Sequence, residues 1–213
     1  MADTSLKTPS RRGRPRNFDR DNALIRALEV FWHSGYELAS VGELCKVMAI
    51  NPPSLYAAFG SKAGLFLEAV NFYETTYWDA HWAQLLAEND VHQAIANFFH
   101  QAAFTLTSQQ APCGCLVVLA AINVSPESAE VYQAAKALRE RGKGYLSQCL
   151  QAGVDRGQLP GDTDVRGLAM TLNTLLQGMS VPAQDGVSRE TLDLVARHAV
   201  GLLPPRPTGE DTH

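Results

Sequence analysis

The chain has 213 residues, of which 46% are hydrophobic and 19% are charged, so it can build a packed core and is not globally disordered. It contains no run of 18 apolar residues, which argues against a membrane-spanning helix. Four cysteines without a preceding signal peptide exclude a disulfide-stapled secreted scaffold, and we expect a cytoplasmic protein.

Charge is divided unevenly along the chain. Residues 1–62 carry nine Lys and Arg against six Asp and Glu, whereas residues 63–213 carry nine basic side chains against sixteen acidic ones. A basic end on an acidic body predicts that only the first end meets a polyanion. Residues 1–17 hold almost no large apolar side chain and are expected to form a disordered basic arm. An arm that only aids solubility is the alternative.

Helix start and stop signals follow the arm in quick succession. Apolar residues recur with helical spacing between Leu24 and Phe31. Ser40 and Glu43 form a capping box, in which the Ser oxygen accepts from the third amide and the Glu reaches back. Pro52 is tolerated in the first turn of a helix, where amides lack intrahelical acceptors. We predict four helices here, over residues 19–35, 40–49 and 51–60 and from a Ser61 cap onward.

The remainder of the chain also has helical periodicity. Residues 91–102 carry one apolar stripe, and a turn is expected at 109–112. Ser125-Pro126 opens a further helix, and a Gly- and Pro-rich loop follows it. No alternating run indicates a strand and no long repeat is present, so the fold is predicted to be all-α. The expected C-terminal helices cover residues 125–152, 165–179 and 192–203, and three prolines at 204, 205 and 207 end the last one.

The first three helices match a helix-turn-helix, because a tight link at Ala49-Ile50 joins the second to the third. In the DNA-binding version of this motif, the exposed face of the third helix enters the major groove. The alternative is ordinary packing of three helices in an all-α protein. The residues predicted to point inward are Val41, Leu44, Val47, Ile50 and Leu55, and those predicted on the DNA face are Asn51, Ser54, Tyr56 and Ala57.

Residues 40–66 closely resemble the DNA-binding domain of TetR-family transcriptional regulators. The most specific part is the Leu-Tyr-x-x-Phe-x-x-Lys-x-x-Leu spacing between Leu55 and Leu65. Two positions depart from the pattern, since Ala39 stands where a Thr is common and Ala49 replaces the usual turn Gly. Ala49 is expected to adopt a slightly strained turn at modest cost. The resemblance implies a DNA-binding domain over residues 18–62.

That resemblance also implies roles for single residues. Tyr56 and Lys62 are expected to contact phosphate, which fixes the register of the protein on DNA. Ser40 is expected to supply a cap or a phosphate contact. Asn51 and Ser54 are the candidates for base edges, because an amide can read adenine through two hydrogen bonds. Pro52 lies between them on the same predicted surface. A half-buried core position is the alternative for Tyr56.

The basic arm carries a second resemblance. Arg12-Gly13-Arg14-Pro15-Arg16 resembles the core of an AT-hook, an extended segment that lies in the minor groove of A·T-rich DNA. A narrow minor groove has enhanced negative potential and attracts Arg side chains, and Gly and Pro keep the segment thin and extended. We therefore expect Arg12, Arg14 and Arg16 to contact DNA.

The family resemblance assigns the body, residues 63–203, to ligand sensing and dimerisation, and leaves 204–213 as a disordered tail. In this family the C-terminal helices enclose a small-molecule pocket and the last two form a four-helix dimer interface. The apolar faces at 165–179 and 192–203 suit that interface, with burial inside one chain as the alternative. Aromatic residues in the middle third suit either a ligand pocket or plain core. The pocket candidates are Phe72, Tyr73, Tyr77, Trp78, Trp82, Phe98, Phe99, Phe104 and Cys115.

The sequence shows no catalytic motif and predicts neither a metal site nor a cofactor. Gly142-Lys143-Gly144 lacks the spacing of a phosphate-binding loop, and the single Cys113-Gly114-Cys115 pair falls short of a zinc site. The predicted function is a homodimeric transcriptional regulator, most simply a repressor that binds an inverted-repeat operator in double-stranded DNA and is released by an unidentified small molecule. The alternative is a thiol-responsive regulator that senses oxidants through Cys113 or Cys115.

Overall fold

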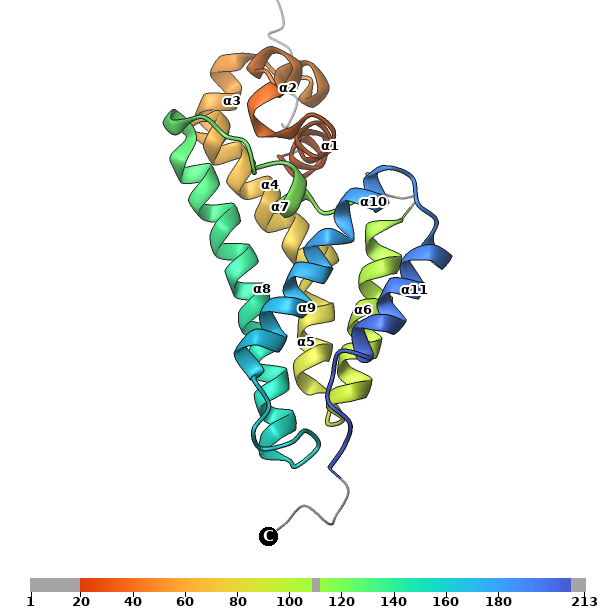
Figure 1. Ribbon diagram of the computed structural model, residues 1–213. Coiled ribbons are helices and arrows are strands. Elements are labelled where there is room, and N and C mark those ends of the chain that lie inside the picture. The colour runs from red at the N-terminus through yellow and green to blue at the C-terminus, as the bar shows by residue number, and fades with distance from the viewer. Residues whose placement is uncertain (1–19, 109–111, 208–213) are drawn as a thin grey trace, which may run out of the picture.

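A computed structural model describes residues 20–108 and 112–207, and every regular element in these ranges is a helix. Figure 1 shows three helices gathered at one end of the molecule and longer helices forming the body below them. The all-α prediction is therefore confirmed. The helices are α1 (Arg20–Leu38), α2 (Val41–Met48), α3 (Pro52–Phe59), α4 (Lys62–Tyr77), α5 (Asp79–Ala87), α6 (Val91–Leu106), α7 (Leu116–Leu119), the 3₁₀ turn η1 (Pro126–Ser128), α8 (Ala129–Asp155), α9 (Val165–Gly178), α10 (Ser180–Gln184) and α11 (Arg189–Val200).

The start signals read from the sequence act as caps in the structure. The Ser40 hydroxyl accepts a hydrogen bond from the Glu43 amide at 3.1 Å and caps α2. Ser61 caps α4 through the Gly64 amide at 2.9 Å. Because each hydroxyl satisfies an amide that lacks an intrahelical acceptor, the beginnings of these helices are fixed locally.

Helix ends depart from the predictions more often than helix starts do. The backbone breaks at Gly35, where φ is 73°, as the sequence predicts, but a further turn continues α1 to Leu38. The long helix that begins at Ser61 is interrupted at Trp78, which divides it into α4 and α5. Helix α8 starts only at Ala129, after the η1 turn, and runs on to Asp155.

The helix-turn-helix is joined to the body by one continuous core. Phe31 of α1 meets Phe66 of α4 edge to face with ring centroids 5.0 Å apart, and both side chains are fully buried. Arg20 at the start of α1 forms an ion pair with Glu68 of α4 at 2.6 Å. The three-helix head, formed by α1, α2 and α3, is therefore attached to α4 by both an apolar and an ionic contact.

The apolar stripes of the C-terminal helices are used mainly inside the chain. Leu192 and Ala196 of α11 are buried where α11 packs against α6, and Leu172 of α9 is buried where α9 packs against α8. These members of the stripes are therefore covered by α6 and α8 of the same chain, and the interface of α9 and α11 with a second copy stays a prediction. A different set of large apolar side chains, on α9, α10 and α11 and just after α11, lies about half exposed, namely Met170, Val181, Leu194 and Leu202.

The C-terminal segment returns to the body at its first residues. The His92 ring lies 3.2 Å from the carbonyl oxygen of Pro204, and Arg206 pairs with the Asp90 carboxylate at 2.5 Å. Residues 204–206 are therefore attached to the body, unlike the disordered tail predicted from residue 204, and residues 208–213 lie outside the described ranges. Within the described residues, none of the helices combines the length and apolar character needed to cross a bilayer.

Candidate DNA interface and ligand cavity

The outer face of α3 presents the polar and aromatic residues that the sequence places on DNA. Asn51, Pro52 and Ser54 are exposed at the start of the helix, and Tyr56 is 49% exposed one turn later. On the opposite face, Leu55 is buried against α2 and α4 and holds the helix in place. The alternative of a core position for Tyr56 is therefore wrong, and its hydroxyl is free to reach outward.

The side chain of Asn51 has a structural task of its own. Its Oδ1 accepts a hydrogen bond from the Ser54 amide at 2.9 Å and caps α3. A two-point contact to adenine uses the amide oxygen as an acceptor and the amide nitrogen as a donor. Since an amide oxygen has two lone pairs, the cap leaves one acceptor site and both N–H donors for such a contact. The assignment to a base edge stays a prediction.

Lys62 is held on the inner side of the head. Its Nζ donates to the carbonyl oxygen of Glu37 at 3.2 Å and lies 4.4 Å from the centroid of the Tyr36 ring. Burial lowers the pKa of the Lys62 ammonium, and the negative charge of Glu37 opposes that effect. In this arrangement Lys62 ties the start of α4 to the end of α1, so a phosphate contact requires the side chain to turn outward. Arg12, Arg14 and Arg16 lie outside the described residues.

Ala49 makes the turn between α2 and α3 in the left-handed region, at φ 56° and ψ 40°. The expected strained turn is therefore present. Its amide donates to the carbonyl oxygen of Lys46 at 3.2 Å, which closes the end of α2. Arg26 of α1 adds a hydrogen bond from Nη1 to the carbonyl oxygen of Val47 at 3.0 Å, which fastens the same turn to the first helix.

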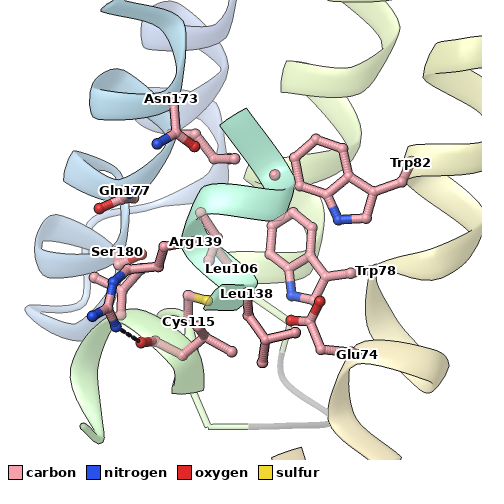
Figure 2. A pocket seen from close by; sticks show the side chains of 14 residues that line it. Glu74, Trp78, Trp82, Leu106, Cys115, Leu138, Arg139, Asn173, Gln177 and Ser180 are labelled. Atoms are coloured by element: carbon pink, nitrogen blue, oxygen red, sulfur yellow. Dashed lines mark hydrogen bonds between the residues drawn. The ribbon is translucent and has the colours of Figure 1, made fainter. Parts of the chain in front are cut away.

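A cavity of about 50 Å³ lies in the body, between α4 and α5 on one side and α9 and α10 on the other (Figure 2). Two indole rings and several aliphatic side chains form most of its wall, with polar groups at intervals. This mixture is typical of sites that bind small molecules. The lining consists of Glu74, Trp78, Trp82, Leu106, Cys115, Val117, Val118, Leu138, Arg139, Gly142, Asn173, Leu176, Gln177 and Ser180.

Of the predicted pocket residues, Trp78, Trp82 and Cys115 line the cavity. Most of the others form the layer behind it, because the same helices turn those side chains into the core. Phe98 packs on Trp82 with ring centroids 4.4 Å apart, and the Tyr73 hydroxyl accepts from Trp78 Nε1 at 2.7 Å. The residues outside the lining are Phe72, which is half-buried, and Tyr73, Tyr77, Phe98 and Phe99.

The placement of Phe104 in the pocket is wrong. Its side chain is 53% exposed and lies under the guanidinium of Arg189, 4.7 Å from the ring centroid, at a separate surface groove. The polar residues of the cavity were missed because aromatic density alone guided the prediction. Asn173 and Ser180 interrupt an otherwise apolar stripe, and both are buried, at 7% and 0% exposure. A polar residue at a buried helical position was the signal that could have found them.

Charge in the cavity is confined to two residues of opposite sign. Glu74 pairs with Arg141 at 3.0 Å, and burial raises the pKa of the Glu74 carboxyl although Arg141 opposes the shift. Arg139 donates from Nη1 to the carbonyl oxygen of Val117 at 2.8 Å. Burial raises the pKa of the Cys115 thiol to about 11, so this residue remains a neutral thiol near pH 7.

The other cysteines divide into one accessible and two enclosed thiols. Cys113 is exposed, whereas Cys45 and Cys149 are buried, and burial raises the pKa of Cys149 to about 11. Because the thiolate is the reactive form, burial makes Cys115 the less reactive of the two candidate thiols, and sensing through Cys113 or Cys115 stays a prediction. Across the described residues, His, Cys, Asp and Glu side chains form no group of three or more suited to a metal ion.

Both the helix-turn-helix and the body of the chain match models of known protein families. Residues 24–69 match the family model of bacterial regulatory proteins of the tetR family, and residues 91–199 match the tetracyclin repressor-like C-terminal domain. The HTH-type transcriptional repressor ComR of Escherichia coli is 37% identical over 194 residues, which cover 91% of this chain and 92% of ComR. The repressor BdcR of the same organism is 30% identical over 195 residues, covering 88% and 90% of the two chains.

A solved structure shows the same architecture on DNA. A cysteine variant of the TetR-family regulator CifR, complexed with 26-base-pair operator DNA, superposes with a TM-score of 0.84 at 42% identity, covering 88% of this chain and 98% of CifR. The match therefore spans the head, the connecting helix and the body. Because separate family models match the head and the body and two repressors match over most of their length, the chain belongs to the TetR family of DNA-binding transcriptional regulators, which are not enzymes.

Proposed function

We propose that this transcriptional repressor binds an inverted-repeat operator as a homodimer and releases it when a small molecule occupies the cavity. The observation that carries the proposal is the segment 114–125, which forms part of the cavity wall and also anchors the helix-turn-helix. Cys115, Val117 and Val118 line the cavity. The same stretch crosses beneath α1 and leads on to α8 (Figure 1).

Three hydrogen bonds attach this segment to α1. Trp32 Nε1 donates to the carbonyl oxygen of Gly114 at 3.2 Å, and the Tyr36 amide donates to that of Ala120 at 2.9 Å. The Ser125 amide donates to the Glu37 carboxylate at 2.6 Å. A ligand that displaces the cavity wall therefore strains these bonds and shifts the preferred position of the head. A ligand changes operator affinity only if it binds the two positions with different affinity.

Dimerisation is supported by the unpartnered apolar positions on the last helices. Met170 and Leu194 are about half exposed on α9 and α11, and Val181 and Leu202 extend the surface. A two-fold dimer would place two α3 helices in successive major grooves, about 34–36 Å apart or somewhat more. The CifR complex with operator DNA supports binding to duplex DNA by a chain of this shape.

The proposal is tested in two steps. Duplexes that bind the protein are first selected from a random library, and fluorescence anisotropy then measures the affinity for the selected sequence and for random DNA. We expect a two-fold symmetric site, two chains per duplex, and an affinity that falls steeply as salt increases. Lys62→Ala should weaken binding to all duplexes alike, whereas Asn51→Ala should relax preference at one position in each half-site. Equal affinity for every duplex would refute the proposal.

A second candidate is release by oxidation of Cys113, favoured by its exposure and by its place one residue before the Gly114 anchor. Under this mechanism an oxidant lowers the operator affinity of the wild type, and Cys113→Ser abolishes that response without changing affinity in reductant. Cys149→Ser serves as the control, because its thiol is buried. An unchanged oxidant response in Cys113→Ser rejects the candidate.

A further inference from the structure

Two buried polar side chains line the cavity, and one of them, Ser180, has no hydrogen-bond partner in the described part of the chain. Ser180 is fully buried, and its Oγ has no hydrogen-bond partner among the described residues. Asn173, 93% buried, lies seven residues earlier on α9 and on the same wall (Figure 2). A buried polar group without a partner is costly and uncommon in native structures. Their position on the cavity wall points to a ligand that carries a polar atom.

The opposite wall is apolar and aromatic. Trp78 and Trp82 present their indole rings across the cavity from Asn173 and Ser180 (Figure 2). Burying an apolar part of a ligand against the indole rings is favourable in free energy. Burying a polar atom is favourable only where it finds hydrogen-bond partners, which is the wall formed by Asn173 and Ser180. The ligand must therefore be two-sided, with a hydrocarbon part toward the indoles and a hydrogen-bonding atom toward α9 and α10.

Charge in the lining disfavours an ion of either sign. An anion entering the cavity meets the Glu74 carboxylate on one wall, and a cation meets the Arg139 guanidinium on another. Each of these groups is already engaged, Glu74 by Arg141 at 3.0 Å and Arg139 by the carbonyl oxygen of Val117 at 2.8 Å. Burying a further charge without a free counter-ion is costly. The ligand is therefore uncharged.

Size limits the ligand further. The cavity volume is about 50 Å³, whereas a cavity of about 150 Å³ holds benzene with its six carbon atoms. By that ratio the cavity holds about two heavy atoms as it stands, so a ligand of three to five heavy atoms requires the lining to move outward when it binds.

An access route is present beside the cavity. Glu74 and Leu138 line both the cavity and an outer groove of about 270 Å³ between α4 and α8. Arg141, which pairs with Glu74, lines the groove and is itself exposed. Separation of this ion pair and rotation of Leu138 would widen the cavity wall toward the groove.

We infer that the cavity binds a small uncharged organic molecule of three to five heavy atoms with a hydrogen-bond-accepting oxygen, which Ser180 and Asn173 recognise. The inference rests on the proposed function, because it names the chemical class of the effector. Both the Ser180 hydroxyl and the Asn173 amide can donate to one oxygen atom, as a carbonyl, amide or hydroxyl group provides.

The chain has three tryptophans, and two of them line this cavity, which provides a direct probe. Protein labelled with 5-fluorotryptophan gives three ¹⁹F resonances, assigned by single Trp→Phe variants. Acetone, acetamide, acetate and isopropylammonium, each with four heavy atoms, are titrated at constant ionic strength. We expect saturable shifts of the Trp78 and Trp82 resonances with acetone and acetamide, and at least tenfold weaker binding of the two ions.

Variants test which groups recognise the oxygen. Ser180→Ala removes an unpartnered hydroxyl and keeps the wall in place, so the fold is retained and acetone should bind about three- to tenfold more weakly. Ser147→Ala, a half-buried Ser of α8 outside the lining, is the matched control and should bind acetone as the wild type does. Unchanged acetone affinity in Ser180→Ala would overturn the inference.

Two further outcomes would also overturn it. One is the absence of saturable shifts with acetone and acetamide, and the other is tighter binding of an ion or of seven-atom cyclohexanone than of acetone. Operator affinity is measured on the same labelled protein. If the operator is bound selectively but the probes fail, the ligand class is wrong and the repressor function stands. If operator binding itself fails, the proposed function is wrong whatever the probes do.

Discussion

Two glycines in the middle of α8 offer a direct test of how tightly the cavity wall is packed. A Cβ added to Gly142 would lie 3.2 Å from Cζ2 and 3.3 Å from Cη2 of Trp82, whereas a Cβ added to Gly144 meets nothing within 4 Å. In a helix interior, Ala is favoured over Gly by about 0.8–1 kcal/mol. Gly144→Ala should therefore stabilise the protein by about that amount.

Gly142→Ala gains the same helix propensity but crowds the indole. Carbon atoms pack best at about 3.5–4.0 Å, so the Trp82 ring must retreat from the new methyl group by a few tenths of an ångström. Overpacking costs about 1–3 kcal/mol in a filled core. Because the cavity lies next to the ring, we expect the lower end of that range. The stability of Gly142→Ala should therefore be close to that of the wild type, about 1 kcal/mol below Gly144→Ala.

Urea unfolding and thermal denaturation measure the difference. For a chain of this length 1 kcal/mol corresponds to about 2–4 °C in Tm, so Gly144→Ala should melt higher by about that amount and Gly142→Ala should not. The methyl group also occupies space at the cavity, so Gly142→Ala should keep selective operator binding and bind acetone more weakly. Equal stabilisation by both substitutions, with acetone binding unchanged in Gly142→Ala, would refute the packing argument.

Three further predictions concern the turn, a buried acid and the thiols. Ala49→Gly should raise the free energy of unfolding in urea by about 0.5–1 kcal/mol. The left-handed backbone at this position costs residues other than Gly about 1–2 kcal/mol, and the greater entropy of Gly in the unfolded chain removes part of that gain. A lower stability of the variant would contradict the assigned turn. Burial raises the pKa of Glu74, so the wild type loses stability as the pH rises from about 4.5, the ordinary pKa, through the raised value. Glu74→Gln should lack that loss, and parallel pH–stability curves for the two proteins would show that Glu74 does not cause it. Iodoacetamide at pH 8 should alkylate Cys113 first and Cys115 and Cys149 much more slowly, because burial raises the pKa of these two thiols to about 11. Mass spectrometry of samples taken over time measures the order of alkylation.

The head of the molecule was predictable because short-range chemistry determines it. A hydroxyl at Ser40 or Ser61 caps a helix through an amide three residues away, so the sequence alone locates both starts. The exposed face of α3 follows from the buried positions of Leu55 and Phe59 four residues apart. The Lys62 contact with Glu37 spans 25 residues, and no local pattern indicated it.

The body was less predictable because its faces are chosen by distant partners. An apolar stripe on a helix shows that something covers it, but it does not distinguish α6 of the same chain from a second copy. The cavity joins residues from position 74 to position 180, so its polar wall depends on how α9 and α10 pack against α4 and α5. Aromatic density singled out Trp78 and Trp82, which line the cavity, but also Phe104, whose helix turns it to the surface.

The central claim is that two copies of the α3 face read two halves of one operator. The most direct measurement compares the affinity of the wild type for the selected inverted repeat with its affinity for the same duplex carrying one scrambled half-site, at fixed salt, with the mass of each complex determined in parallel. We predict two chains on the intact site and an affinity at least a hundredfold lower on the scrambled one, as loss of several base contacts at about 1–3 kcal/mol each requires. Equal affinity for the two duplexes, or a single chain on the intact site, would contradict the account.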